Sequence, residues 1–331
     1  ARPLLVLLQV PEGVLDRACI YLKIIILGSP FTYFYNALAA ALKSVGDSRT
    51  PVRFLIFASL LNAALDLVFI GQLGFGIVCS AVTTVVAEGV SAALTWYHIR
   101  KAVPMLSPDK KTFRIDRRLL KTTLRYGSVT ALQQACQPVG KLLIQGAVNP
   151  LGVDVIAAFQ AVNRVDDFAF TPEQSISHGI TTFTAQNLGS RQDEERKRER
   201  VGAGLRTGLL LEFLYWIFIF LLVYLGRVPV MKAFVTGQGS TGVVEAGSRY
   251  LGTMAFFYLL PAFTNGLQGF FRGRGKMGIT LAGTFIQTSL RVAVTYLTAP
   301  VLGIYGVTIA CAVGWTAMLL FEVPKIGRAH V

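Results

Sequence analysis

The sequence predicts an all-α polytopic membrane protein, and three observations lead to this fold class. Hydrophobic residues make up 53% of the 331 residues and charged residues only 15%, well below the quarter that is usual in soluble domains. The apolar residues gather in runs of about 20 residues or more, the length that a helix needs to cross a bilayer. None of these runs shows the short alternation of a membrane β-barrel, so lipid-exposed backbone must be helical. The composition therefore excludes an ordinary soluble enzyme.

Nine apolar runs are long enough to form transmembrane helices. Lys and Arg collect in the loops after the first, third, fifth and seventh runs, whereas the loops near Gly71, Pro150 and Pro300 are almost free of them. Because basic loops remain in the cytoplasm, we predict a multi-pass protein of a bacterial-type inner (plasma) membrane with a cytoplasmic C-terminus. The net charge of +14 then reflects topology, and no nucleic-acid partner is expected. The nine runs cover residues 14–42, 51–71, 74–99, 122–148, 154–188, 202–226, 243–271, 277–300 and 303–323.

A repeat at an offset of 229 residues relates the two ends of the chain. Two related halves of this kind are a common plan in secondary transporters. If the halves are equal, a twelve-helix bundle of two six-helix lobes (6+6) is expected, with nine helices visible and a truncation at the N-terminus. In this register the matches are Tyr21-Leu22 with Tyr250-Leu251, Asn36 with Asn265, Lys43 with Arg272, Gly46 with Gly275, and Leu73-Gly74 with Leu302-Gly303.

The repeat also predicts the domain organisation. Residues 1–10 are the remnant of a third helix, residues 11–99 form helices 4–6 of the first lobe, and residues 100–121 form a basic cytoplasmic linker. Residues 122–325 form a complete second lobe with helices 7–12. Residues 326–331 match a translated sequencing adapter, so we exclude them from the fold as a suspected artefact.

Short polar and glycine-containing motifs interrupt the apolar runs. They are Pro11-Glu12-Gly13-Val14, Gly28-Ser29-Pro30, Gly46-Asp47-Ser48-Arg49-Thr50-Pro51, Leu61-Asn62-Ala63-Ala64-Leu65-Asp66, Ala185-Gln186-Asn187-Leu188-Gly189 and Phe271-Arg272-Gly273. Together, over about residues 1–325, they resemble the multidrug and toxic compound extrusion (MATE) family. This resemblance implies a secondary active efflux antiporter that exports cationic or amphipathic organic compounds in exchange for Na+ or H+ by alternating access of two lobes.

The strongest candidate site combines Asp66 with Asn62. The two residues are four apart, so they share one helical face and offer a carboxylate and an amide oxygen, which are ligands that a hard cation prefers. Thr84 lies at a similar predicted depth across the turn near Gly74. The resemblance implies that these three residues bind the coupling cation, Na+ or H+, with an aspartate of a first helix that this chain lacks. The alternative is that Asp66 only hydrogen-bonds a neighbouring helix.

Three further polar residues are candidates for an additional site. Glu88 lies one turn beyond Thr84 and either extends the same polar face or approaches the cytoplasmic end of its span. By resemblance, another branch of the family has coupling acids in its seventh and tenth helices. Gln137 stands at the first place, and residues 246–271 contain no Asp or Glu, so cation coupling in the second half is not expected. Glu173 is a further intramembrane acid, and such residues are functional candidates by default.

Prolines and further charged residues inside the spans each have a structural and a functional interpretation. Pro30, Pro172 and Pro261 predict helix kinks, which suit a rocking transporter but are also ordinary in membrane helices. Arg164, Asp166 and Asp167 form a predicted mutually neutralised cluster, and Lys141 and Arg291 are isolated cations.

A lipid-linked oligosaccharide flippase of the same wider superfamily is the alternative function. It would need a basic central cavity, for which Lys141, Arg164 and Arg291 are few and scattered. A membrane enzyme has no HExxH, GxSxG or paired CxxC motif to support it. We therefore expect no enzyme activity and no cofactor, and small organic, cationic substrates and the lipid bilayer as partners of a monomer.

Overall fold

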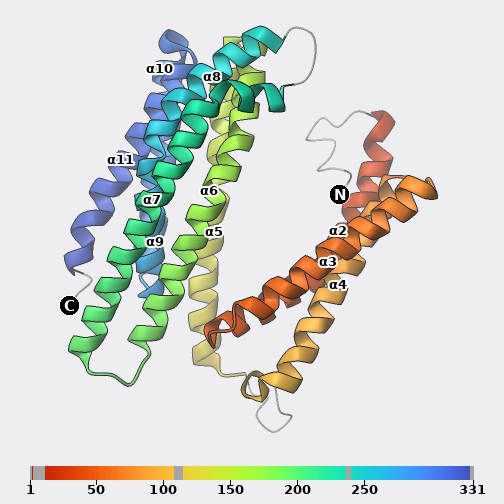
Figure 1. Ribbon diagram of the computed structural model, residues 1–331, viewed down its shortest axis with the longest axis vertical. Coiled ribbons are helices and arrows are strands. Elements are labelled where there is room, and N and C mark those ends of the chain that lie inside the picture. Colours follow the sequence, from red (N-terminus) through yellow and green to blue (C-terminus); the bar gives the residue numbers. More distant parts are fainter. Residues whose placement is uncertain (1, 3–11, 108–114, 236–239, 329–331) are drawn as a thin grey trace. The chain divides into compact units, whose positions relative to one another are not determined.

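The computed structural model describes residues 2, 12–107, 115–235 and 240–328, and the regular structure in these ranges is entirely helical (Figure 1). This confirms the all-α fold class. The chain divides into two compact units, residues 1–114 and 115–331. Apart from residue 2, the predicted helix remnant at residues 1–10 lies outside the described residues.

The first unit contains three long helices and a π-helix. They are α2 (Glu12–Ser44), α3 (Arg49–Asp66), η1 (Leu67–Gln72) and α4 (Ile77–Ala102), followed by the short 3-10 helix η2 (Pro104–Leu106). α4 packs against both α2 and α3, which scarcely touch each other. The α2–α4 contact is close at Gly28, where an added Cβ would lie 2.2 Å from Val85 Cγ2. Only Pro51 and Ala58 of α3 are buried, so most of its apolar side chains are not covered within this unit.

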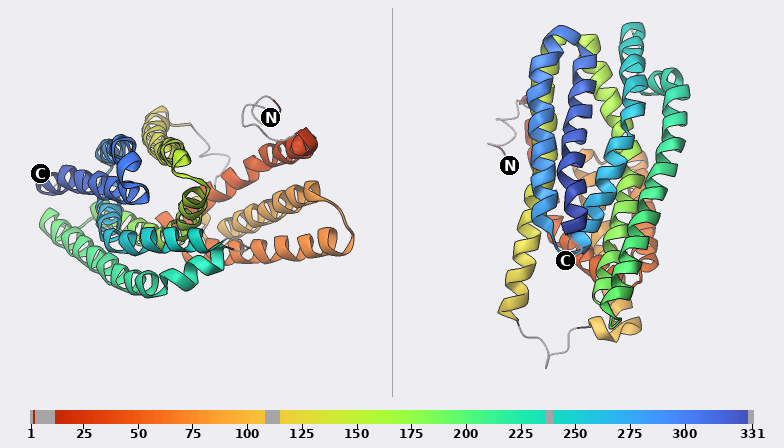
Figure 2. Two further views of the ribbon diagram at one scale, coloured as in Figure 1. Left: turned by 90° about the horizontal axis from the view of Figure 1, so that it is seen from above. Right: turned by 90° about the vertical axis from the view of Figure 1, so that its left-hand side faces the viewer.

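The second unit contains seven longer helices. α10 and α11 form an antiparallel hairpin (Figure 2), α5 packs against α10, and α6 packs against α7, α8 and α9. The helices are α5 (Arg117–Val148), α6 (Val153–Leu188), α7 (Glu194–Phe234), α8 (Ser240–Phe257), α9 (Leu259–Gly273), α10 (Met277–Leu302) and α11 (Ile304–Arg328), with a short 3-10 helix η3 (Asn149–Leu151) between α5 and α6.

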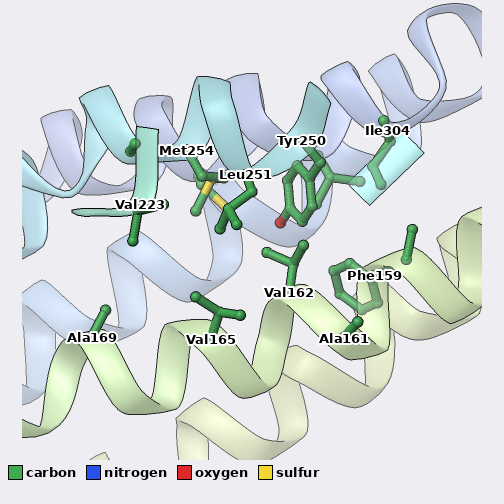
Figure 3. Packing of buried hydrophobic residues seen from close by; sticks show 14 of the residues in the cluster. Phe159, Ala161, Val162, Val165, Ala169, Val223, Tyr250, Leu251, Met254 and Ile304 are labelled. Carbon is green, nitrogen blue, oxygen red and sulfur yellow. The ribbon is translucent and has the colours of Figure 1, made fainter. Parts of the chain in front are cut away.

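The largest apolar core of the second unit joins side chains of α5, α6, α7, α8 and α11. Phe159 and Val162 of α6 face Tyr250 and Leu251 of α8 (Figure 3), and the rings of Phe159 and Tyr250 are 6.2 Å apart. Phe159 and Val162 are three residues apart on α6, and Met254 of the same core follows Leu251 by three residues and Tyr250 by four on α8, the spacing of one helical face. This core fixes the position of α6 against its neighbours, and thereby the position of the polar residues that α6 carries.

The predicted spans and the helices differ in several places, and one is α7, which runs from Glu194 to Phe234 and so extends beyond the predicted span 202–226 at both ends. The predicted span 243–271 is broken at Tyr258 into α8 and α9. The predicted span 51–71 changes from α-helix to π-helix after Asp66. α11 continues to Arg328, so it includes the first three of the six residues excluded as an artefact, and the other three lie outside the described residues.

Six helical segments of the described chain are long and apolar enough to cross a membrane. They are Leu15–Ser44, Arg49–Gln72, Ile77–Ala102, Glu194–Ala233, Met277–Leu302 and Ile304–Gly327. The other three predicted spans, 122–148, 154–188 and 243–271, correspond to α5, α6 and the α8–α9 pair. These helices carry the buried polar residues Gln133, Asp166, Glu173 and Gln268, which lower their apolar content.

The internal repeat is confirmed in the backbone of the turns. Gly46 and Gly275, which are 229 residues apart, both have positive φ, of 95° and 72°. Gly74 and Gly303 match in the same way, with φ of 70° and 58°. The first pair also shares its hydrogen bonds: the N–H of Gly46 donates to the Lys43 carbonyl at 3.1 Å, and that of Gly275 donates to the Arg272 carbonyl at 2.9 Å.

Asp47 stabilises the turn that follows Gly46. Its Oδ1 accepts a hydrogen bond of 3.1 Å from the backbone N–H of Thr50, and His98 Nε2 lies 3.6 Å from its Oδ2. Hydrogen bonds from the Thr50 side chain and backbone hold the pKa of the Asp47 carboxyl below its ordinary value. The turn therefore keeps a negative charge at neutral pH next to the start of α3, where the helix dipole favours it.

Candidate functional site

A pocket of about 330 Å³, with several polar side chains in its lining, lies within the first unit, between α2, α3 and α4. It contains two of the three predicted coupling residues, Asn62 and Thr84, together with Glu88. Its lining residues are Thr32, Tyr35, Asn36, Leu55, Ala58, Ser59, Asn62, Thr84, Ala87, Glu88 and Ser91.

Hydrogen bonds connect the three helices at this pocket. Asn62 Nδ2 donates to Thr84 Oγ1 at 3.4 Å, and the Thr84 hydroxyl donates to the Ser80 carbonyl at 2.8 Å. The Thr32 hydroxyl of α2 donates to Glu88 Oε2. Glu88 thus lines the same pocket as Asn62 and Thr84, and its depth in the membrane stays a prediction.

Asp66 lies one turn from this pocket and is half-buried. Ser80 Oγ donates to its Oδ2 at 3.4 Å, and the Thr83 hydroxyl donates to its Oδ1. Ser80 thus links the two clusters, because its hydroxyl binds Asp66 and its carbonyl accepts from Thr84. In the part of the chain that the structure describes, no ion pair is recorded for Asp66, so hydroxyl groups rather than a cationic side chain bind its carboxylate.

From the residue count we expected Thr84 at the same depth as Asp66. In the structure Thr84 instead binds Asn62, one turn away from Asp66. α3 and α4 are consecutive helices joined by a short turn, and in their pairing Asn62 lies opposite Thr84 while Asp66 lies opposite Ser80 and Thr83. The residue count from Gly74 therefore misplaced Thr84 by about one helical turn relative to Asp66. Ser80 and Thr83 were missed, although polar residues recur on α4 every three or four positions from Ser80 to Thr95.

A second polar cluster lies in the second unit and is centred on Gln133 rather than on Gln137. Gln137 is exposed and donates to Gln287 Oε1 at 3.5 Å. Gln133, one turn earlier, is buried and donates to Gln268 Oε1 at 2.9 Å and to Thr284 Oγ1 at 3.0 Å. Sequence reasoning could not choose between two glutamines on neighbouring turns, because the rotation of α5 decides which of them is buried.

Glu173 is fully buried in α6, where Asn265 Nδ2 donates to its Oε2 at 3.2 Å. The structure adds Glu212 of α7, which is also fully buried and was not among the sequence candidates. The signal that could have found it is the one that singled out Glu173, an acid inside a long apolar run, here from Leu209 to Phe220.

The expected cluster of Arg164, Asp166 and Asp167 is wrong. Arg164 is exposed, whereas Asp166 is buried and accepts a hydrogen bond of 2.5 Å from the Tyr258 hydroxyl. Asp167 forms an ion pair of 2.8 Å with Lys141 of α5, so Lys141 is not isolated. Arg291 is buried near Asp166 and Cys311, with which it interacts electrostatically. The helical spacing suggested local pairs, but the side chains point to different neighbouring helices.

The three prolines occupy different helical settings. Pro30 lies inside α2, and the Ser29 hydroxyl donates at 2.8 Å to the Ile26 carbonyl, the acceptor that Pro30 cannot serve. Pro172 lies inside α6. Pro261 lies in the first turn of α9, just after the helix break at Tyr258. Their role in transport remains a prediction.

Comparison with known proteins gives a consistent result. The family model MatE matches residues 1–68 and 130–297, more than half of the chain. Among curated relatives, the chain is 28% identical over 276 residues to the probable multidrug resistance protein YpnP of Bacillus subtilis, covering 83% of this chain and 59% of that protein. It is 26% identical over 278 residues to the probable multidrug resistance protein NorM of Thermotoga maritima, covering 81% and 56%.

These relatives are longer than the chain, which spans between about half and three fifths of their length. A solved multidrug resistance transporter of the MATE family, in an outward-facing conformation, matches with a TM-score of 0.88 at 22% identity, covering 97% of this chain and 71% of that one. At this identity the likeness shows the fold. Because the family model covers more than half of the sequence and the helices follow the same fold, the chain belongs to the MatE family.

Proposed function

We propose that the chain works in secondary active multidrug efflux, exporting cationic or amphipathic organic compounds in exchange for Na+ or H+. Family members of known structure include transporters, and the expectation of no enzyme activity agrees with the family. The substrate class, the coupling ion, the plasma-membrane location and the monomeric state are parts of the proposal.

The observation that supports cation coupling best is the polar network between α3 and α4. Asp66 is bound by the hydroxyls of Ser80 and Thr83, and Asn62 is bound to Thr84 one turn away. Carboxylate, amide and hydroxyl oxygens suit Na+, and the carboxylate alone suits a proton. A charge inside a membrane helix costs about 2.5–3.5 kcal/mol on insertion scales, so a bound cation would offset part of the cost of keeping Asp66 ionised.

Binding at this network can drive export only if it favours one conformation of the transporter. A cation that binds one state more tightly shifts the population toward that state, and the affinity for the exported compound must change reciprocally. In this mechanism Asp66 binds the cation, while Asn62, Thr84 and Glu88 line the adjoining pocket.

The test is Asp66→Asn in the complete gene product, reconstituted in vesicles under an imposed Na+ or H+ gradient. We expect gradient-driven efflux of a cationic dye to fall at least about tenfold at equal membrane abundance, within the range of typical coupling energies. Glu195→Gln, which changes an exposed carboxylate at the start of α7, is the control and should keep wild-type efflux.

Unchanged efflux in Asp66→Asn would remove this residue from the mechanism. Loss of membrane insertion in Asp66→Asn would instead favour a structural role. Export that proceeds in both proteins without an ion gradient, or movement of lipid-linked oligosaccharides instead of the dye, would contradict the proposed antiport and favour the flippase alternative.

A further inference from the structure

Two acidic side chains meet in the interior of the second unit, away from the network at Asp66. Glu173 of α6 and Glu212 of α7 both have 0% exposure, and their carboxylates interact electrostatically. α9 packs against both helices. Asn265 of α9 binds Glu173, and the next residue, Gly266, faces Glu212: a Cβ added there would lie 3.7 Å from Glu212 Cγ.

These carboxyl groups have few hydrogen-bond partners. Asn265 donates to Glu173 Oε2, but Glu173 Oε1 and both oxygens of Glu212 are buried without a partner among the described residues. A buried acceptor that makes no hydrogen bond is costly, and an unpaired buried charge is more costly still. The pair therefore lacks groups that would stabilise two negative charges.

The ionisable groups around the pair do not neutralise it. Asp166 of α6 interacts electrostatically with Glu173, the Tyr215 hydroxyl of α7 interacts with both acids, and Tyr258, between α8 and α9, interacts with Glu173. All three are acids. Two cations, Arg291 of α10 and Lys141 of α5, interact with Asp166.

Two ionised carboxylates at such a place repel each other in a medium of low dielectric constant. Protonation of one of them removes the repulsion and supplies a hydroxyl donor for an oxygen that now has none. We propose that Glu173 and Glu212 form a proton-binding carboxyl pair, in which a carboxylate takes up H+ to become a carboxylic acid and releases it by the reverse step. The pair would be a proton site separate from the cation network of the first unit.

Infrared spectroscopy of the purified full chain in detergent tests this directly, because a protonated carboxyl group has a C=O band that shifts in D2O. We expect the wild type to show such a band at neutral pH and the double variant Glu173→Gln with Glu212→Gln to lose the part of its intensity that the pair contributes, while any part from Glu322, another fully buried acid, remains. Glu245→Gln is the matched control, because Glu245 is an exposed carboxylate paired with Arg249, and the band should remain.

Titration of single variants separates a coupled pair from two independent acids. In the wild type the band should be lost in two steps as pH rises. Glu173→Gln and Glu212→Gln should each show one step, at lower pH than the second wild-type step, because the negative neighbour is gone. If the double variant does not fold, the two single variants still show whether Glu173 and Glu212 titrate as a coupled pair.

Two results would overturn the proposal. One is a wild-type spectrum without the protonated band at neutral pH, or with a band that both single variants retain unchanged. The other is a band that disappears on addition of NaCl but not of choline chloride, which would make the pair a Na+ site. Neither measurement depends on transport, so failure of the antiport proposal would leave this test intact.

Discussion

Gly46 ends α2 in a backbone conformation that is unfavourable for residues with a side chain. Its φ is +95°, and no atom lies within 4 Å of the position that a Cβ would occupy. Crowding therefore plays no part, and only the backbone conformation should determine the effect of substitution. The equivalent Gly275 also lies near Tyr126, so Gly46 is the cleaner of the two repeated positions.

We predict that Gly46→Ala lowers the free energy of unfolding by roughly 1–2 kcal/mol, the cost of a left-handed conformation for an L-residue. Gly46→Asn should cost less, because Asn tolerates this region better. Thermal unfolding of the purified protein in detergent measures both. Equal stability of the Ala variant and the wild type would mean that the turn does not need this conformation.

At the scale of whole helices, α6 and α9 approach each other through glycines and hydroxyl groups. The Ser177 hydroxyl donates to the Asn265 carbonyl at 2.6 Å, and the Thr181 hydroxyl donates to the Gly269 carbonyl at 3.0 Å. A Cβ on Gly269 would lie 2.4 Å from the backbone oxygen of Ser177. Small residues that allow backbones to approach are typical of helix packing in membranes, and here they position Asn265 beside Glu173.

Gly269→Ala should therefore separate the two helices and lower the free energy of unfolding by roughly 1–3 kcal/mol, as overpacking does. Gly179→Ala in α6 is the matched control, because no atom lies within 4 Å of its Cβ position and Ala favours a helix. Thermal stability of the two variants in the same detergent is the measurement. If both variants unfold at the same temperature, the contact between α6 and α9 tolerates an added methyl group, and the close approach at Gly269 does not contribute to stability.

Breaks in the helices also have local causes. α8 and α9 separate at Tyr258, in the turn before Pro261, where the ring of proline removes a donor and crowds the preceding turn. The π-helix η1 begins directly after Asp66, and such widened turns are frequent at functional sites.

At the scale of the whole molecule, the distribution of basic residues predicts how the chain is threaded through the membrane. The segment that runs from the α6–α7 loop into the first turns of α7 is basic, with Arg191, Arg196 and Lys197, and is predicted to be cytoplasmic, whereas the segment between α5 and α6 is predicted to be external. Gln192 and Pro150 are exposed in these two connections.

We predict that Pro150→Cys reacts with a membrane-impermeant maleimide in intact cells and that Gln192→Cys reacts only after permeabilisation. Both variants are made after replacing the four native cysteines, which are free thiols. The opposite labelling pattern would reverse the orientation, and with it the cytoplasmic assignment of the C-terminus.

Much of the fold could be predicted from the sequence because its signals are local. Long apolar runs require helices in a membrane, and a glycine at a helix end reflects a conformation of that residue alone. The 229-residue register therefore found Gly46 and Gly275, whose backbones match. Predicted spans missed the break at Tyr258 and the π-turn after Asp66, because each of these local events leaves the hydrophobic pattern unchanged.

The partners of the polar residues were decided by the tertiary structure. The sequence by itself identified Asp66, Asn62, Thr84 and Glu173 as intramembrane polar groups, since a polar residue in an apolar run is visible without any fold. Which groups meet depends on the rotation and stagger of packed helices, which are set by contacts between distant parts of the chain. For that reason only the structure placed Ser80 at Asp66 and brought Glu212 to Glu173.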